Sequence, residues 1–259
     1  MGFIRLGGNL ETGEGGTTLA GAATMRGEPP ISDGECFMVE NVVRPLPPMD
    51  TRMDALPGDG EVMVASSLRC PTVSFDVWVL GSSARRRESL RRLSAMLAAK
   101  ERTRLAFSDD GGLYYHVVRT GALEPIEYID SAMMHVELKS LHPWMFGKTT
   151  ELDVGTSMSL FTPGGNYPGA LELRSNSSIT TDANGAFKML GLTFGGLDAS
   201  TAYTLNVFNT ETRQFRVGTR YVAPALSGTW PVFTPGEYKQ LQVTQGSGTV
   251  ALKYTDRWL

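Results

Sequence analysis

The side chains that most often carry catalysis or bind metals are few in this sequence. Its three histidines, His116, His135 and His142, lie in or beside predicted strands, with no cysteine or paired carboxylate at metal-ligand spacing. We therefore expect them at ordinary surface or edge positions of a sheet. The two cysteines, Cys36 and Cys70, cannot form a disulfide framework, and we expect buried free thiols in a reducing compartment.

Carboxylates also give little support for an enzyme. Asp109 and Asp110 precede two glycines, which is typical of a turn, and a glycosidase pair at these residues or at Glu124 and Glu127 is the alternative. The sequence has no Gly-Lys-Ser/Thr phosphate loop, no Gly-x-Ser-x-Gly elbow and no His-Glu-x-x-His motif. It therefore predicts no catalytic residue, no cofactor and no metal.

Composition and charge exclude further classes of function. The 259 residues carry a formal net charge of -3, which gives no electrostatic footprint for nucleic acid or for an acidic membrane surface. No apolar run approaches the ~20 residues that a membrane-spanning helix needs. The first residues lack the apolar core of a signal peptide, so we expect synthesis in a cytoplasm without an export signal.

The elements that would position functional residues are mainly strands. Residues 70–80 alternate, with Val73, Phe75, Val77 and Val79 on one face, which predicts a half-buried strand. After Gly81 the period changes, because leucines recur at 90, 93 and 97 on one arc of a helix. This helix is predicted over about 83–101, and a hairpin follows over 104–107 and 113–118. The chain is therefore expected to be mainly β with one α-helix.

The predicted helix begins with an unusual charge distribution. Arg85, Arg86 and Arg87 lie in or near its first turn, where the helix dipole disfavours cations. Glu88 offsets this in part and is spaced to pair with Arg92. A solvated charged face is the ordinary interpretation. The alternative is that the three arginines contact acidic groups on a neighbouring subunit.

A polar hairpin is predicted over about 50–61, with turn signals at its tip. Such a hairpin would project from a sheet and could serve as a contact arm. Its candidate interface residues are Asp50, Arg52, Asp59 and Glu61. The Gly-rich segment 9–34 is expected to be a long loop or a second arm with little packing of its own.

The pattern predicts two domains. Residues 1–150 form the first, which includes an alternating strand with Met134, Val136 and Leu138 directed inward. Residues 151–168 are expected to be linker strands, and 169–259 contain short alternating segments between turns, which is typical of a β-sandwich or jelly roll. Three aromatic residues of this second domain are either core or platforms for stacking sugars, namely Trp230, Tyr238 and Trp258.

The order of features in residues 36–146 carries a family resemblance. A Val-rich strand precedes Arg44-Pro45, and the segment 56–61 precedes the strand that ends at Leu80. The Arg-Arg-x-x-Leu helix, residues 105–110 with Tyr114-Tyr115, and a strand into His142-Pro143-Trp144 follow in order. This arrangement resembles the distal tail protein of bacteriophages with long, non-contractile tails. His142 stands where that family has a small residue, and the C-terminal part, ending in 233–238 and 256–259, is similar to the family's galectin-like sandwich.

The resemblance implies a fold and a structural role. The fold would be an N-terminal β-sandwich or split-barrel-like ring domain followed by a C-terminal galectin-like, jelly-roll β-sandwich. Such proteins form a ring, usually a hexamer, at the virion tail tip after assembly in the host cytoplasm. The ring joins the tail tube protein to the tail-tip hub and to fibres or receptor-binding proteins, and DNA passes through it without specific binding.

Other functions remain as alternatives. The chain could be a host-carbohydrate-binding adhesion module, in which the C-terminal sandwich would hold a cell-surface glycan, or a tail-tube subunit, which would polymerise without closing into a ring. A hydrolase would require turnover of cell-wall material that depends on Asp109 or Glu124. Glycan binding and ring formation are compatible, because weak binding repeated around a ring gains avidity.

Overall fold

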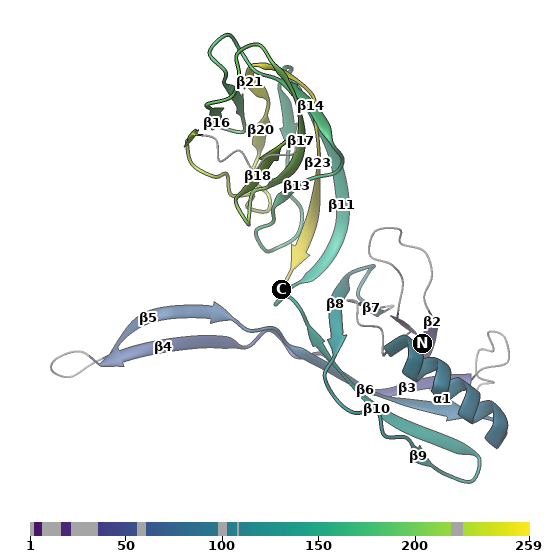
Figure 1. The fold of residues 1–259 in the computed structure, drawn as a ribbon. Helices are drawn as coiled ribbons and strands as arrows, with labels where there is room; N and C mark the ends of the chain where they lie inside the picture. Colours follow the sequence, from purple (N-terminus) through teal and green to yellow (C-terminus); the bar gives the residue numbers. More distant parts are fainter. Residues whose placement is uncertain are drawn as a thin grey trace. The chain divides into compact units, whose positions relative to one another are not determined.

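The computed structural model describes residues 3–6, 17–21, 36–55, 61–97, 103–107, 109–218 and 225–259. Over these ranges the chain is mainly β, with α1 as the helix, which confirms the predicted fold class (Figure 1). The chain divides into two compact units. Unit 1 comprises Met1–Phe146 together with Leu259, and unit 2 comprises Gly147–Trp258.

Unit 1 is built on a sheet that closes on itself. Its elements are β1 (Phe3–Leu6), β2 (Thr17–Gly21), β3 (Cys36–Val43), β4 (Met49–Ala55), β5 (Glu61–Leu68), β6 (Thr72–Leu80), α1 (Ser83–Leu97), β7 (Thr103–Phe107), β8 (Tyr114–Arg119), β9 (Ile126–Glu127), β10 (Ser131–Ser140) and the start of β11 (Met145–Val154). The strands run β8-β7-β1-β2-β3-β6-β10, and β10 pairs back with β8 to close the circuit. Strands β2 and β3 are parallel, and the other pairs in this circuit are antiparallel.

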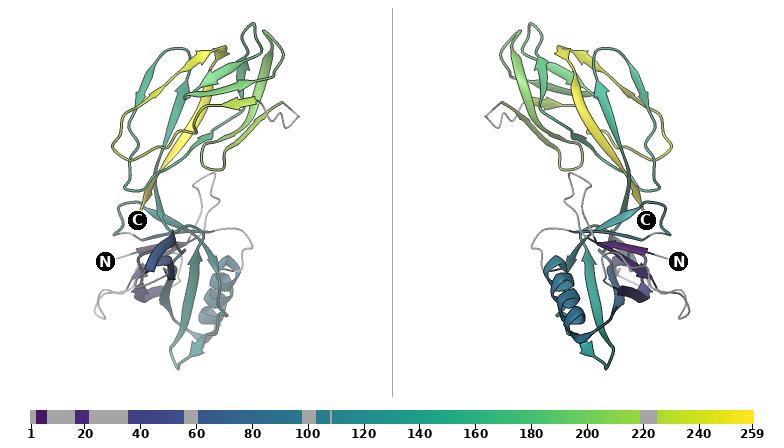
Figure 2. Two further views of the ribbon diagram at one scale, coloured as in Figure 1. Left: turned by 90° about the vertical axis from the view of Figure 1, so that its left-hand side faces the viewer. Right: turned by 90° about the vertical axis from the view of Figure 1, so that its right-hand side faces the viewer.

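Alternation along β6 and β10 creates the core of unit 1. One face of β6 is fully buried, as predicted, and the inward residues of β10 are buried with it. Helix α1 covers this face through Leu90, Leu93 and Leu97, which confirms the arc predicted from their spacing. Views from two sides show α1 lying along the strands of unit 1 (Figure 2). The remaining face of β6, which carries Asp76 and Trp78, does not take part in this core.

The structure differs from the sequence interpretation within residues 9–34. Thr17–Gly21 form β2, which pairs with β1 on one side and with β3 on the other. Local sequence gives only a weak strand signal here, and pairing with two neighbours in the sheet decides the conformation. Residues 7–16 and 22–35 lie outside the described ranges.

Unit 2 is a β-sandwich. Its strands are the remainder of β11, β12 (Ser159–Phe161), β13 (Leu171–Leu173), β14 (Ser177–Thr180), β15 (Phe187–Met189), β16 (Leu192–Gly195), β17 (Ala202–Asn209), β18 (Gln214–Val217), β19 (Ala225–Ser227), β20 (Lys239–Leu241), β21 (Val243–Gln245), β22 (Ser247–Gly248) and β23 (Val250–Trp258). One sheet has the order β22-β14-β17-β13-β23-β11 with β18 added on β17, and the other has the order β19-β16-β15-β21. A short third sheet pairs β12 with β20.

The core of unit 2 lies between these sheets and is rich in aromatic rings. Phe187, Phe194, Phe208 and Tyr254 are all essentially inaccessible to solvent. The segment 162–168, expected as a linker, contacts this unit directly, because the amides of residues 166 and 167 donate to the carbonyl of Arg257. Strand β11 begins in unit 1 and continues into unit 2, so the chain passes between the units within a strand.

Candidate assembly surface

Strands β4 and β5 form a two-stranded ribbon that projects from unit 1, and we call it the arm (Figure 1). Among the described residues no third strand pairs with either edge of the arm. Register places Met49 opposite Leu68 and Met53 opposite Met63, and a bulge at Val64 adjusts the pairing between them. The arm therefore extends the predicted hairpin beyond residue 61 and gives it two distinct faces.

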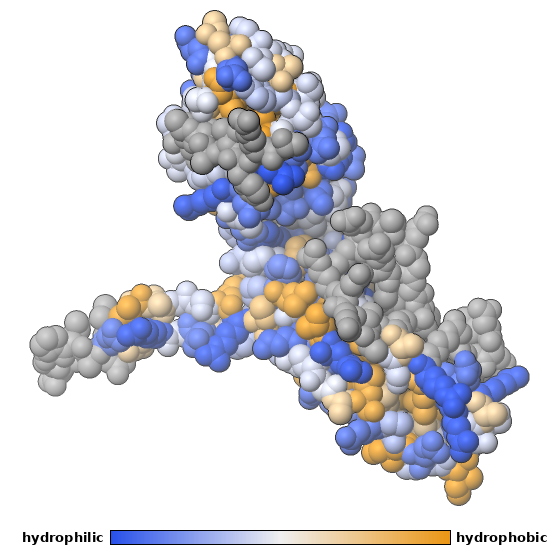
Figure 3. Space-filling model, in the orientation of Figure 1, coloured by the Kyte–Doolittle hydropathy of each residue, from blue (hydrophilic) through white to orange (hydrophobic). Residues whose placement is uncertain are grey.

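One face of the arm carries its methionines, with the Thr51–Ser66 pair between them, and is uncovered. Met49, Met53 and Met63 are 68%, 46% and 60% exposed, and Val64 at the bulge is also exposed. In the space-filling view, apolar side chains alternate with polar ones along the arm (Figure 3). An isolated two-stranded hairpin is marginally stable in water, and exposed methionines are typical of adaptable binding surfaces. The arm thus has the chemistry of a contact element.

The opposite face of the arm carries charges that pair with one another. Asp50 accepts a hydrogen bond from Arg69 at 2.7 Å, and Arg52 lies 3.4 Å from Asp54. Both pairs are exposed, so each contributes little to stability and remains available to a partner. Asp59 lies outside the described ranges, and of Glu61 the structure describes only the backbone.

The three arginines at the start of α1 do not behave alike. Arg85 and Arg87 are exposed, and neither has an ion-pair or hydrogen-bond partner among the residues that the structure describes. Arg86 is buried and donates hydrogen bonds to the carbonyls of Gly81 at 2.7 Å and Tyr128 at 3.4 Å. Its guanidinium therefore links the helix to the loop before β10 inside one subunit, where it is not available to a neighbouring one.

The acidic residue of the helix, Glu88, lies close to an arginine of the next turn. Glu88 lies 3.9 Å from Arg91, one turn away at i+3, and both side chains are exposed. The side chain of Arg92, the predicted partner, lies outside the described ranges. No acidic residue lies in the first turn, so the basic charge there is uncompensated by local carboxylates.

An apolar loop that the sequence analysis missed lies against the start of α1. The ring of Tyr128 stacks on Trp78 with centroids 5.5 Å apart, and Ile129 is 99% exposed. Ile126, in β9, is half exposed and lies opposite Met133 in the register of β9 and β10. The signal available in the sequence was an isoleucine between a tyrosine and an aspartate, a combination that is not typical of a simple turn.

Asp109 and Asp110, for which the alternative was a glycosidase pair, bind the guanidinium of Arg44 at the base of the arm. Arg44 donates to Asp109 at 2.7 and 3.1 Å and to Asp110 at 2.7 Å, and its guanidinium lies 4.7 Å from the centre of the Phe107 ring. Arg44 follows β3 and precedes β4, so this ion pair ties the root of the arm to the turn between β7 and β8. Both carboxylates are occupied by a structural contact.

The two carboxyl groups have opposite pKa shifts. The hydrogen bond from Arg44 lowers the pKa of Asp109 below its ordinary value. Burial raises the pKa of Asp110, although Arg44 contacts one of its oxygens. The second oxygen of Asp110, Oδ2, is buried without a hydrogen-bond partner among the residues that the structure describes, which is why the loss of solvation dominates the pKa shift of this group.

These shifts predict a pH-dependent effect of substitution. A lowered folded-state pKa stabilises the fold fully above the ordinary carboxyl pKa of about 4, and this contribution is lost as the pH falls through the lowered pKa of the folded state. Asp109→Asn should therefore lower the urea midpoint at pH 7 and have a smaller effect near pH 2.5. The loss should stay below about 1 kcal/mol, because Asp109 is exposed.

Asp110 should behave in the opposite sense, because its raised pKa makes the ionised form unfavourable in the fold. Asp110→Asn is expected to cost less than Asp109→Asn at pH 7, since it removes a partly desolvated charge. Asp130→Asn, at an exposed aspartate, is the control and should leave the urea midpoint unchanged at pH 7. An equal penalty for Asp109→Asn at both pH values would contradict the assignment.

The expectation that all three histidines lie at surface or edge positions is wrong for His116, which is buried among aromatic rings. His116 stacks on Phe146 with ring centroids 4.3 Å apart, and His142 stacks on Trp144 at 5.4 Å. His135 lies on the open face of the sheet, 2.7 Å from Asp76. Within the described ranges, no three His, Cys, Asp or Glu side chains converge as they would around a metal ion. In the same ranges no helix has the length and hydropathy of a membrane-spanning segment.

The candidate sugar-stacking residues in unit 2 have different environments. Trp230 is half-buried and packs on the core, with its ring 6.0 Å from that of Phe208. Trp258 is half-buried at the end of β23. Tyr238 is 79% exposed just before β20, and Leu160 on the paired strand β12 is also exposed. Of the three, Tyr238 alone presents a largely open ring.

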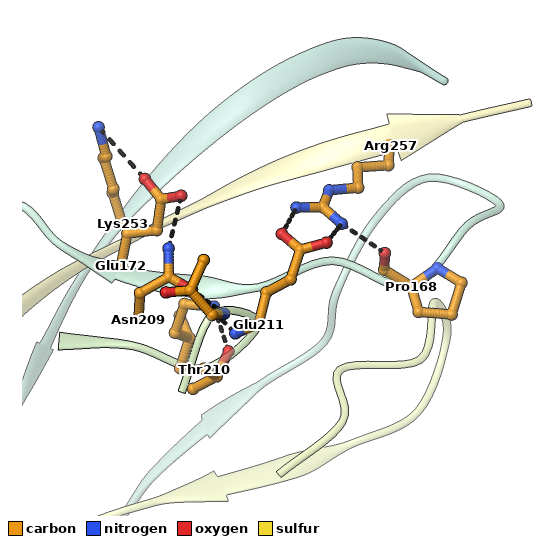
Figure 4. A network of polar contacts seen from close by, with 9 residues as sticks. Pro168, Glu172, Asn209, Thr210, Glu211, Lys253 and Arg257 are labelled. Atoms are coloured by element: carbon orange, nitrogen blue, oxygen red, sulfur yellow. Dashed lines mark hydrogen bonds and ion pairs between the residues drawn. The ribbon is translucent and has the colours of Figure 1, made fainter. Parts of the chain in front are cut away.

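A network of polar contacts fastens the end of β23 (Figure 4). Arg257, only 8% exposed, donates two hydrogen bonds to Glu211 at 2.6 and 3.0 Å and a third to the carbonyl of Pro168 at 3.3 Å. Nearby, Glu172 accepts from Asn209 at 3.1 Å and lies 3.7 Å from Lys253. The network joins the β17–β18 turn and the 162–168 segment to the last strand. Its role is therefore to stabilise unit 2.

We compared the sequence and the fold of this chain with those of known proteins. No family model matches the sequence, and no curated protein matches it at the level of sequence. Among solved structures, the Dit protein (gp 19.1) of phage SPP1 is similar, with a TM-score of 0.62 and 15% identity over 86% of this chain and 94% of that one. A chain of the phage P2 baseplate in its activated conformation with Ca gives a TM-score of 0.48 and 8% identity over 98% of both. The SPP1 match confirms, for the fold, the resemblance to distal tail proteins that the order of sequence features indicates.

Proposed function

We propose that this protein is a structural, non-enzymatic component of a bacteriophage tail tip, in which copies of the chain form a closed ring. The observation that carries the proposal is the arm, whose apolar face is uncovered in a chain with the fold of the SPP1 protein. That protein is described as a paradigm of the hub adsorption apparatus in phages that infect Gram-positive bacteria. A hub consists of several subunits, and the arm supplies a surface through which one subunit could contact another.

The ring would connect a tail tube protein to the tail-tip hub and to receptor-binding proteins or fibres. Six copies are the expected number, assembled in the host cytoplasm and located in the virion tail tip. Rings require heterologous contacts between two different faces of each copy. The arm provides one such face. The start of α1, together with the loop before β10, provides another. A net charge of -3 suits a channel through which DNA passes without being held.

The direct test is the mass of the purified full chain by light scattering, followed by negative-stain imaging of the same peak. A discrete particle of about six times 28.1 kDa with a central hole is the expected result. Open-ended polymers would favour the tail-tube alternative. A monomer throughout a concentration series up to about 1 mM would contradict a ring that forms from this chain alone.

A second function, binding of host carbohydrate, is favoured by one observation. Tyr238, with its open ring, directly precedes β20, in which Gln240 lies opposite the exposed Leu160 of β12, and an aromatic platform with an amide nearby in sequence suits a sugar. Glycan-array binding by the full chain that is lost in Tyr238→Ala, and kept in Met158→Ala, would support this function. If the unmodified ring bound no glycan, the structural role would be the only function that remains.

A further inference from the structure

We propose that the arm of one copy docks on a specific surface of the next copy, formed by the first turn of α1 and the loop before β10. We call this the helix–loop surface and define it by Arg85, Arg87, Ile126, Tyr128 and Ile129. The inference rests on the proposed ring and names the two surfaces that meet in it. In Figure 1 the arm extends away from α1, so the arm and the helix–loop surface lie on opposite sides of unit 1, as contacts with two different neighbours require.

The helix–loop surface is exposed yet held in place. Stacking on Trp78 fixes the ring of Tyr128, and the Tyr128 amide donates to the carbonyl of Ser131 at 2.8 Å. The buried Arg86 contacts the carbonyl of Tyr128 from the helix side. These contacts order the loop and leave the side chain of Ile129 fully in solvent. A rigid, exposed apolar group is the kind of anchor that protein interfaces use, because little entropy is lost when it is covered.

Apolar character extends from this loop across the open face of the sheet. Met133 lies opposite Trp78 on one side and opposite Ile126 on the other, so the three residues form a row across β6, β10 and β9. Strand β9 is two residues long, and in the part of the chain that the structure describes no strand pairs with its outer edge. A ribbon such as the arm could lie along this edge with its methionines over Ile126 and Ile129.

Charge makes a second copy the best partner for this surface. The sequence of α1 contains five arginines and one glutamate, whereas residues 49–69 contain four carboxylates and two arginines. Arg85 and Arg87 extend from the positive end of the helix without described partners, where an anionic group is favoured. Asp54 is half exposed, and its one described ion-pair contact is 3.4 Å long. The basic start of α1 and the acidic arm are therefore complementary in charge, just as the apolar residues of the two surfaces are complementary in hydrophobicity.

Photo-crosslinking tests this arrangement in the assembled full chain. Replacing Ile129 with p-benzoylphenylalanine and irradiating the ring should give crosslinked peptides that join residue 129 to residues 49–69 of a second copy. The same replacement at Leu160, an exposed leucine of unit 2, is the control and should give no crosslink to the arm. A ring whose crosslinks from residue 129 lead elsewhere would overturn the inference and leave the ring intact. Absence of any assembly would overturn the inference together with the proposed ring.

Charge reversal provides an independent test. Arg85→Glu with Arg87→Glu should raise the concentration for half-assembly by at least about tenfold, because like charges would face each other. Adding Asp54→Arg to this variant should recover part of the loss. Arg86 is left unchanged because it is buried, and Arg119→Glu, at an exposed arginine of β8, is the matched control. Normal assembly of the double variant would overturn the inference.

Discussion

Replacing Met53 and Met63 together with serine should raise the concentration at which the protein assembles by roughly thirtyfold, without changing the stability of the subunit. The two residues face each other across the arm, and neither packs on a core in the free subunit. Fully covering a methionine contributes about 1.5–3 kcal/mol. Met53 and Met63 are only 46% and 60% exposed in the free subunit, so covering what remains contributes about 1 kcal/mol each. Their loss therefore weakens each contact by about 2 kcal/mol, which is a factor of about thirty.

Light scattering over a concentration series is the measurement, with urea unfolding of the monomeric form as the check on folding. Surface substitutions away from packing contacts usually change stability by less than about 0.5 kcal/mol. Met158→Ser, at a methionine of unit 2 that is 58% exposed, is the matched control and should leave assembly unchanged. If the double variant assembled at the same concentration as the unmodified protein, the arm could not be the main contact.

The alternation of apolar residues along the strands and the spacing of the leucines in the helix were sufficient to predict the core of unit 1. The alternation of β6 and β10 and the leucine arc of α1 each depend on local geometry, and the structure confirms them. The same geometry contained a signal for Arg86 that the charge argument overlooked. Residue 86 precedes Leu90 by four and Leu93 by seven, which places it on the buried arc of the helix. Its exposed neighbours Arg85 and Arg87 lie off that arc.

The faces of the arm could not be predicted in the same way. Residues 50–61 read as polar because the methionines of β4 and β5 meet only through the register of the two strands and the bulge at Val64. The contact between Arg44 and Asp109 joins residues 65 positions apart in the sequence. Likewise, the Tyr128 loop gains its apolar platform from Trp78, which belongs to another strand. Each of these features is created by tertiary pairing, which composition and spacing do not encode.

The second large effect is expected for Arg257→Ala, which should lower the stability of unit 2 by about 2–3 kcal/mol. Removing one partner of a buried ion pair typically costs about 3–5 kcal/mol, because the other charge loses its partner. Glu211 is about half exposed, so water can solvate it in the variant and the cost should lie at or below the lower end of that range. The loss of the contact to the Pro168 carbonyl adds to the effect, because it frees the 162–168 segment from the same side chain.

Thermal unfolding followed by circular dichroism measures this change, and the midpoint should fall by roughly 10 °C. Arg257→Lys should recover little, because an ammonium group cannot reproduce the two parallel hydrogen bonds to Glu211. Lys253→Ala is the matched control from the same network, because its exposed ammonium lies 3.7 Å from Glu172 and should contribute less than about 0.5 kcal/mol. Equal shifts for Arg257→Ala and Lys253→Ala would mean that the buried pair does not fasten β23. A large shift for Arg257→Ala alone would establish that this pair, together with the Pro168 contact, holds the last strand, the β17–β18 turn and the 162–168 segment in one unit.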